Sequence, residues 1–111
     1  MYGLFGRGQV RDLTPEEVSA GMAEGRILLI DVREPNETEV ERIPGSLLLP
    51  LSTLDPLEIP EPQGKTVVFS CRSGNRSVKA CEMAQAAGVT IDAHLAGGIK
   101  AWKEAGLPTE P

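Results

Sequence analysis

The sequence predicts an α/β domain with a mostly parallel central sheet of about five strands and helices on both faces. Apolar runs rich in β-branched residues alternate along the chain with segments of helical period. The runs at 26–33 and 66–70 are almost continuously apolar, which is typical of parallel strands covered on both faces. Glycines and prolines mark the turns and loops between these segments.

The individual elements follow from capping residues, period and helix breakers. Thr14 and Glu17 match a capping box at the start of the first helix. Asn36 is expected to cap a second, short helix, and Gly88 to end the longest one. In chain order we expect a strand at 9–11, a helix over 14–24, a strand at 26–33, a short helix over 37–41, a strand at 47–50, a helical turn near 53–57, a strand at 66–70, a helix over 75–87, a strand at 89–95 and a helix over 99–105.

The composition indicates one ordinary globular domain. We expect residues 1–8, with three glycines, to be a flexible lead-in to a single domain over residues 9–111. Sixteen acidic residues against eleven basic ones give a net charge of -5, which disfavours nucleic acid and anionic membranes as partners. No apolar run is long enough to span a bilayer and no signal-peptide core is present, so a cytoplasmic setting is expected.

Cysteine and histidine are scarce in the chain. The two cysteines lie ten residues apart on one strand–helix unit, where they are poorly placed to form a disulfide. A single histidine and the lack of a Cys-x-x-Cys motif argue against a metal site. We therefore expect a free thiol at Cys71, no metal and no cofactor.

The strongest functional signal is the segment 71–77, Cys-Arg-Ser-Gly-Asn-Arg-Ser, between a buried strand and a helix. This position places the thiol of Cys71 beside the unpaired N–H groups of a helix N-terminus, which stabilise a thiolate. Gly74 allows the loop to curl so that its N–H groups point inward, and Arg72 and Arg76 add positive charge. The segment therefore predicts a nucleophilic sulfur at the centre of an anion-binding loop.

Two chemistries use a loop of this kind, and its length distinguishes them. A cysteine phosphatase typically has five residues between its cysteine and its arginine, whereas only four separate Cys71 from Arg76. Ser77 stands where the phosphatase arginine would be. The shorter loop argues against phosphatase or arsenate reductase activity and favours attack on a single sulfur atom.

Four separated segments of the chain resemble a single-domain rhodanese, a member of the thiosulfate:cyanide sulfurtransferase family. The resemblance covers about residues 10–108 in family order, so chance agreement is a poor explanation. One departure is Arg42, at a position where relatives often carry histidine. The matching segments are Asp-Val-Arg-Glu-Pro at 31–35, Ile-Pro-Gly-Ser at 43–46, the whole of 71–77, and Leu-Ala-Gly-Gly-Ile-Lys-Ala-Trp at 95–102.

The resemblance implies a small α/β fold, an active loop over Cys71–Arg76 and a ping-pong cycle. The thiolate of Cys71 takes the outer sulfur of thiosulfate, a small anionic donor, and then passes it to cyanide or a thiol. The alternative is a sulfur-relay or regulatory module that carries the persulfide to a protein acceptor. We expect the loop residues that follow Cys71 to bind substrate: Arg72, Ser73, Gly74, Asn75 and Arg76.

Other polar residues are expected to support the loop or the core. Asp31 and Arg33, at the end of a strand, and Ser77 are expected to orient the loop without taking part in the chemistry. His94 lies between apolar strand residues and is expected to be structural, because a thiolate stabilised by a helix needs no base. Cys81 is expected to be a small buried side chain.

Overall fold

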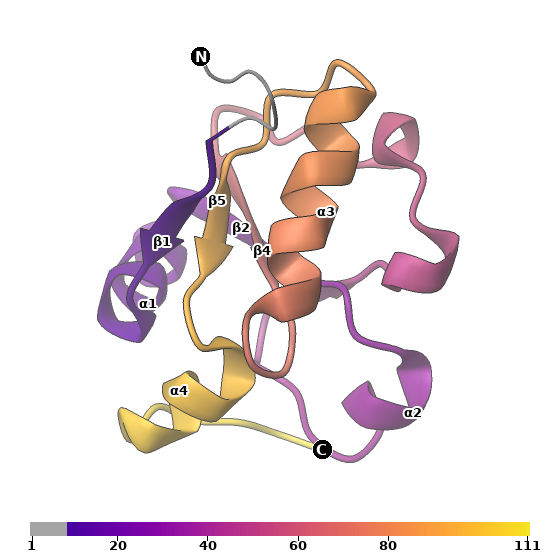
Figure 1. The fold of residues 1–111 in the computed structure, drawn as a ribbon. Helices are drawn as coiled ribbons and strands as arrows, with labels where there is room; N and C mark the ends of the chain where they lie inside the picture. The colour runs from indigo at the N-terminus through magenta and orange to yellow at the C-terminus, as the bar shows by residue number, and fades with distance from the viewer. Residues whose placement is uncertain (1–8) are drawn as a thin grey trace.

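Five parallel strands form one sheet in the order β1-β5-β4-β2-β3 in a computed structural model that describes residues 9–111 (Figure 1). The expected lead-in over residues 1–8 lies outside the described residues. The predicted fold class, a parallel sheet of about five strands with helices on both faces, is confirmed. The strands are β1 (Arg11–Leu13), β2 (Ile27–Asp31), β3 (Leu47–Leu48), β4 (Thr66–Ser70) and β5 (Ala93–Leu95).

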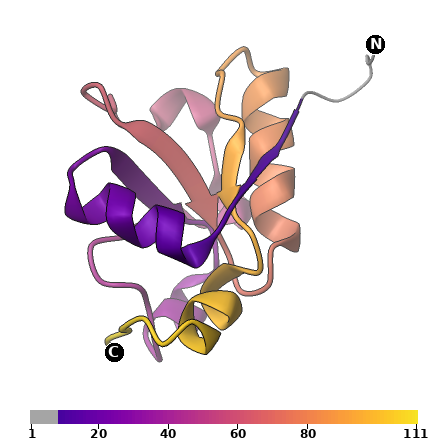
Figure 2. The same cartoon turned by 90° about the vertical axis from the view of Figure 1, so that its left-hand side faces the viewer.

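Helices cover the two faces of the sheet in separate layers, and Figure 2 shows α1 and α3 on opposite sides of it. Residues of α1 and α4 pack in one core cluster, whereas α3 packs in the other together with leucines of the segment between β3 and β4. That segment carries two 3-10 turns, Leu51–Thr53 and Pro56–Glu58. The α-helices are α1 (Pro15–Ala23), α2 (Pro35–Thr38), α3 (Asn75–Ala86) and α4 (Gly98–Glu104).

The continuous apolar runs exist because the central strands bury both of their faces. Leu29 packs in the core cluster under α1 and α4, and its neighbour Ile30 packs in the cluster under α3. Val68 and Phe69 of β4 divide between the two clusters in the same way. Successive side chains of a strand point to opposite faces, so each run fills two cores at once.

The first helix begins as predicted, whereas the second does not. Thr14 Oγ1 accepts a hydrogen bond from the Glu17 N–H at 3.1 Å, and the Thr14 N–H donates to Glu17 Oε1 at 2.9 Å. The expectation that Asn36 caps the second helix is wrong, because α2 begins at Pro35 with Glu34 as its N-cap. Proline fixes the first helical φ and favours an extended residue before it, so the helix begins at Pro35, before Asn36.

Several predicted elements are shifted or shorter in the structure. The first strand lies two residues later than expected, β3 has two residues, and the last strand covers only Ala93–Leu95 instead of 89–95. The single turn expected near 53–57 is replaced by the two 3-10 turns on either side of Leu54. None of these differences alters the strand order. No helix within residues 9–111 has the length and apolar character needed to cross a membrane.

The register of β2 and β4 sets the position of the candidate site. These two strands are neighbours, and Asp31 pairs with Ser70 at their carboxyl ends. The segments that follow, Val32–Arg33 and the Cys71 loop, therefore leave the sheet side by side. Ligands of parallel α/β sheets bind at this edge.

Candidate active site around Cys71

A sharp backbone turn between β4 and α3 positions the thiol. Gly74 is the N-cap of α3 and has φ 112°, a left-handed conformation that side chains other than glycine adopt rarely. The turn directs the Gly74 N–H to Cys71 Sγ at 3.1 Å, and the Ser77 N–H from the first turn of α3 lies 3.4 Å from the same sulfur. The N–H groups that the sequence predicted to surround the sulfur are therefore in place.

These hydrogen bonds stabilise the thiolate of Cys71, although the residue is only 1% exposed. Burial alone would raise the pKa of the thiol. In the thiolate form, the hydroxyl of Ser77 can donate to the sulfur beside the N–H groups of Ser77, Gly74 and Ser73, and together these donors outweigh burial, so the pKa of Cys71 is lowered. The site thus favours the nucleophilic form of cysteine.

Backbone hydrogen bonds from the first turn of helix α4 hold the Cys71 loop in place. The Ile99 N–H donates to the Cys71 carbonyl at 2.9 Å, and the Lys100 N–H donates to the Arg72 carbonyl at 3.1 Å. A Cβ atom at Gly98, whose φ is +62°, would overlap the carbonyl of Cys71 and would lie 2.5 Å from that of Arg72. The glycine therefore permits the close approach that lets α4 fix the loop.

Arg76 turns away from the sulfur to α2. Its Nη1 and Nη2 donate to the two carboxylate oxygens of Glu37 at 2.6 and 2.9 Å. Hydrogen bonds from Arg76, and a smaller contribution from the Glu34 N–H, hold the pKa of Glu37 at about 2 against the opposing effect of burial. In this conformation Arg76 connects the start of α3 to α2, and its role in binding substrate stays a prediction.

Asp31 and Arg33 form a buried ion pair that shapes the neighbouring segment. Arg33 Nε lies 3.1 Å from both carboxylate oxygens of Asp31, and its Nη2 lies 2.8 Å from Oδ2. The guanidinium also donates to the carbonyl of Glu41 at 2.8 Å. The pair thus fixes the chain between α2 and β3, and the role of Asp31 and Arg33 in orienting the Cys71 loop stays a prediction.

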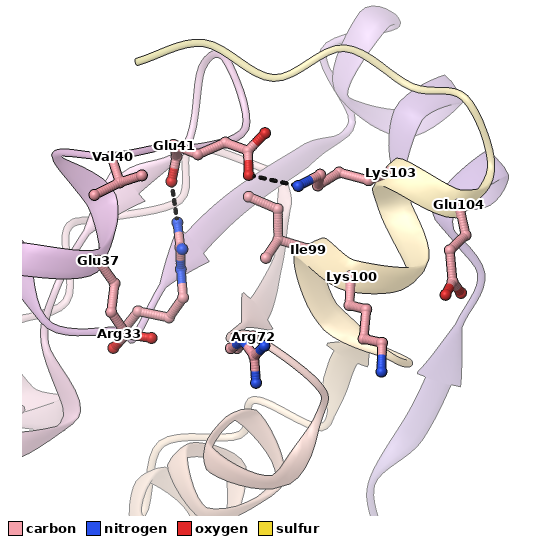
Figure 3. Close-up of a pocket in the computed structure, with 9 residues that line it drawn as sticks. All are labelled: Arg33, Glu37, Val40, Glu41, Arg72, Ile99, Lys100, Lys103 and Glu104. Carbon is pink, nitrogen blue, oxygen red and sulfur yellow. Dashed lines mark hydrogen bonds and ion pairs between the residues drawn. The ribbon is translucent and has the colours of Figure 1, made fainter.

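A cavity of about 410 Å³ opens beside the loop (Figure 3). Arg72 of the loop and Ile99 of α4 line it, and Arg33 lies across the cavity from Lys100 and Glu104 of α4. Ion pairs engage the other charged residues of its lining, whereas Arg72, Lys100 and Glu104 have no ion-pair partner among the described residues. The complete lining is Arg33, Glu37, Val40, Glu41, Arg72, Ile99, Lys100, Lys103 and Glu104.

The other predicted binding residues of the loop face solvent. The side chains of Ser73 and Asn75 are exposed, while the Ser73 N–H contributes to lowering the pKa of Cys71. Asn75 is the first residue of α3. The structure thus assigns the contact with sulfur to the backbone of this part of the loop.

Sequence reasoning missed the surroundings of Ser77. Its Oγ lies 3.5 Å from Cys71 Sγ and 2.8 Å from Nδ1 of His94, and His94 Nε2 lies 2.6 Å from Oδ1 of Asp12. Asp12 is 82 positions away from His94 in sequence, and no local motif connects the two. Only the parallel pairing of β1 with β5, which sets Asp12 opposite His94, brings them together.

The side chains of Cys81 and Arg42 take no part in the hydrogen bonds of the Ser77 hydroxyl and the Cys71 sulfur. Cys81 is buried in α3, and burial raises the pKa of its thiol to about 12. Arg42 pairs with Glu110 through its side chain at 2.8 Å and through two backbone hydrogen bonds. The arginine at this position therefore anchors the C-terminal segment and does not contact the loop.

Comparisons with known proteins identify the family. The model of the rhodanese-like domain matches residues 14–105. A solved rhodanese-related protein from Thermoplasma volcanium has a TM-score of 0.77 at 31% identity, and the match covers 90% of this chain and 97% of that one.

Relatives among curated proteins include sulfurtransferases. An uncharacterized Synechocystis protein is 43% identical over 87% of this chain, which spans only 54% of that relative's length. A sulfurtransferase of Allochromatium vinosum is 38% identical, with 89% of this chain and 94% of the relative covered. The human thiosulfate:glutathione sulfurtransferase is 30% identical, and the match covers 79% of this chain and 89% of that relative.

These names and the family match support sulfur transfer as the general chemistry of the site. The parallel sheet, the cysteine loop between β4 and α3 and the extent of the match agree with one another. The chain belongs to the rhodanese-like family.

Proposed function

We propose that the chain is a thiosulfate sulfurtransferase that carries sulfane sulfur as a persulfide on Cys71. The observation that supports this most strongly is the set of N–H groups, from Gly74 and Ser77, that face Cys71 Sγ at the start of α3. These donors stabilise the thiolate before attack, and they can stabilise the anionic outer sulfur of a persulfide after it. A loop of this length suits one sulfur atom rather than a phosphate group.

The cycle consists of two displacements at sulfur. In the first, the Cys71 thiolate attacks the outer sulfur of thiosulfate, a new S–S bond forms, and sulfite leaves with the electron pair of the broken bond. In the second, cyanide or a thiolate attacks the outer sulfur of the persulfide, and Cys71 leaves as a thiolate. Hydrogen bonds that lower the pKa of Cys71 also make it a better leaving group in this second step.

The cavity beside the loop is proposed to receive the anionic substrates. Arg72 and Lys100 line it without ion-pair partners among the described residues, while Arg76 is engaged by Glu37. A thiosulfate anion, or an acceptor thiol that carries carboxylates, would find two free cations there. The similarity to a thiosulfate:glutathione sulfurtransferase supports an acceptor of the second kind.

The alternative, a persulfide carrier for a protein acceptor, also has an observation in its favour. Val40 lies at the edge of the cavity with 76% of its surface exposed, so an acceptor protein that reached the loop could cover this apolar side chain. Both functions require the persulfide, and they differ in how fast small acceptors remove it.

The experiment is a steady-state assay of thiocyanate release from thiosulfate and cyanide, repeated with a small carboxylate-bearing thiol as acceptor. We expect turnover that is lost in Cys71→Ser and retained in Cys81→Ser, the matched control. A persulfide that forms on Cys71 but is not removed by either small acceptor would favour the protein-relay function. Hydrolysis of an aryl phosphate that depends on Cys71 would overturn the argument from loop length.

A further inference from the structure

A chain of hydrogen-bonded side chains leads from the buried thiol to the protein surface. Cys71 Sγ lies 3.5 Å from Ser77 Oγ, and Ser77 Oγ lies 2.8 Å from His94 Nδ1. On the other side of the imidazole ring, His94 Nε2 lies 2.6 Å from Asp12 Oδ1. Ser77 and His94 are buried, whereas 75% of the Asp12 side chain is exposed. The four residues come from α3, β5, β1 and the loop after β4, so the arrangement is a product of the tertiary fold.

The carboxylate at the outer end determines the tautomer of the histidine. An ionised carboxylate only accepts hydrogen bonds, so the short contact with Asp12 requires a proton on His94 Nε2. In the neutral imidazole, Nδ1 is then an unprotonated acceptor that faces Ser77. Asp12 thus orients the ring so that its free lone pair points toward the thiol.

The hydroxyl of Ser77 has one hydrogen and three acceptors within reach. They are His94 Nδ1, Cys71 Sγ and the carbonyl of Gly74 at 3.1 Å, and that carbonyl already accepts the Val78 N–H at 3.4 Å. While His94 is neutral, the hydroxyl must donate to Nδ1 or leave this nitrogen without a donor. Once Nδ1 is protonated, it donates to Ser77 Oγ, and the hydroxyl hydrogen is free to turn toward the sulfur.

We propose that His94, oriented by Asp12, is a positioning residue that holds the proton of Cys71 through Ser77. The Cys71 S–H bond breaks as the proton passes to Ser77 Oγ, the Ser77 O–H bond breaks as its proton passes to His94 Nδ1, and both electron pairs stay behind. The products are a thiolate and an imidazolium paired with the Asp12 carboxylate. No oxidant, metal or further reactant is needed.

This inference rests on the proposed function and extends it to both displacements. With the proton on His94, Ser77 donates to the thiolate that attacks the sulfur donor. In the second displacement, the same hydrogen bond stabilises Cys71 as it leaves the persulfide. His94 therefore acts through Ser77 and does not contact either substrate, in place of the purely structural role expected from the sequence.

The other titratable groups near the His94 ring are neutral or paired with each other. Within residues 9–111, Asp12 of β1 and Ser77 of α3 make the hydrogen bonds to the His94 ring. Cys81 of α3 lies 3.6 Å from the neighbouring Ala93 carbonyl and has a pKa of about 12, so it stays neutral. Arg11 of β1 and Asp92, the residue before β5, pair with each other at 3.1 Å. The charge balance of the relay thus depends on Asp12 and Cys71.

The test measures the ionisation of Cys71 without sulfur transfer. The reduced protein is first treated with cyanide to remove any outer sulfur, and the rate of iodoacetamide alkylation at Cys71 is then followed across pH by peptide mass. His94→Asn retains a hydrogen-bond acceptor near Nδ1 but cannot hold a proton. Asp12→Asn removes the charge from an exposed position where folding is at little risk, and Asp92→Asn is the matched surface control.

We expect the alkylation midpoint of His94→Asn to rise by about one pH unit, with a roughly tenfold slower rate at neutral pH. Asp12→Asn should shift it in the same direction with about a threefold effect, and Asp92→Asn should match the unmodified chain. Unchanged midpoints in both His94→Asn and Asp12→Asn, or an equal shift in Asp92→Asn, would overturn the inference. If these shifts occur but thiosulfate leaves no persulfide on Cys71, the relay stands and the proposed function fails.

Discussion

The ion pair between Glu37 and Arg76 makes a prediction about the dependence of stability on pH. The change is Glu37→Gln, which keeps the size of the side chain and removes its charge. Hydrogen bonds from Arg76 lower the pKa of Glu37 from 4.5 to about 2. At about 1.4 kcal/mol for each pH unit, this corresponds to at most about 3.5 kcal/mol of folding free energy.

Solvent reduces this value, because the side chains of Arg76 and Glu37 are 33% and 25% exposed. We therefore expect Glu37→Gln to lower the free energy of unfolding by about 1–2 kcal/mol at neutral pH. A carboxyl group with a depressed pKa stabilises the fold above its unfolded pKa and loses this effect as pH falls through the folded value. The difference between the two proteins should thus be constant above about pH 5 and shrink steadily toward about pH 2.

Urea unfolding at a series of pH values measures this difference, with the fluorescence of the single, buried Trp102 as the signal. Glu39→Gln, at an exposed position just after α2, is the matched control and should leave the stability unchanged. A destabilisation by Glu37→Gln that does not vary between about pH 6 and about pH 3 would refute the reasoning. It would mean that packing, and not the charge on Glu37, connects the two helices.

Two further predictions concern the loop itself. Gly98→Ala places a Cβ against the carbonyls of Cys71 and Arg72, so we expect it to destabilise the fold by about 2 kcal/mol or more and to reduce persulfide formation. Gly106→Ala is the control: its Cβ would have nothing within 4 Å, so only the positive φ should matter and the cost should be about 1 kcal/mol. Thermal unfolding and mass spectrometry check both variants, and equal effects would contradict the close approach. Because the pKa of Cys71 is lowered and that of Cys81 is about 12, iodoacetamide at neutral pH should label Cys71 in the folded protein and Cys81 only after unfolding in urea. Labelling of Cys81 in the folded protein at the same rate as Cys71, measured on its peptide, would show that the difference in pKa does not control which cysteine reacts.

Most of the fold was predictable because local patterns and the tertiary structure agree. The apolar runs at 26–33 and 66–70, which bury both faces, form strands β2 and β4. Thr14 and Glu17 form the expected capping box. The prediction failed at Asn36, because Glu34 competes with it as the N-cap and Pro35, directly after Glu34, favours the first helical position. It also overestimated the last strand, of which only Ala93–Leu95 pairs with neighbours.

The candidate site was predictable where it is local and unpredictable where it depends on distant residues. A cysteine, a glycine turn and a helix start lie within seven positions, so the N–H groups around the sulfur could be inferred from Cys71 and Gly74 alone. The direction of Arg76 depends on Glu37, 39 positions earlier, and the orientation of His94 depends on Asp12 in the first strand. A sequence shows that such side chains exist, but the pairing of strands and helices determines which of them meet.

The most direct test of the central claim is the mass of the intact protein after thiosulfate treatment and removal of excess reagent. Sulfur transfer through Cys71 predicts a gain of one sulfur atom, located on the peptide that contains Cys71 and removed as thiocyanate when cyanide is added. The gain should be absent in Cys71→Ser and present in Cys81→Ser. A folded protein that gains no sulfur, or that gains it equally in Cys71→Ser, would contradict the account.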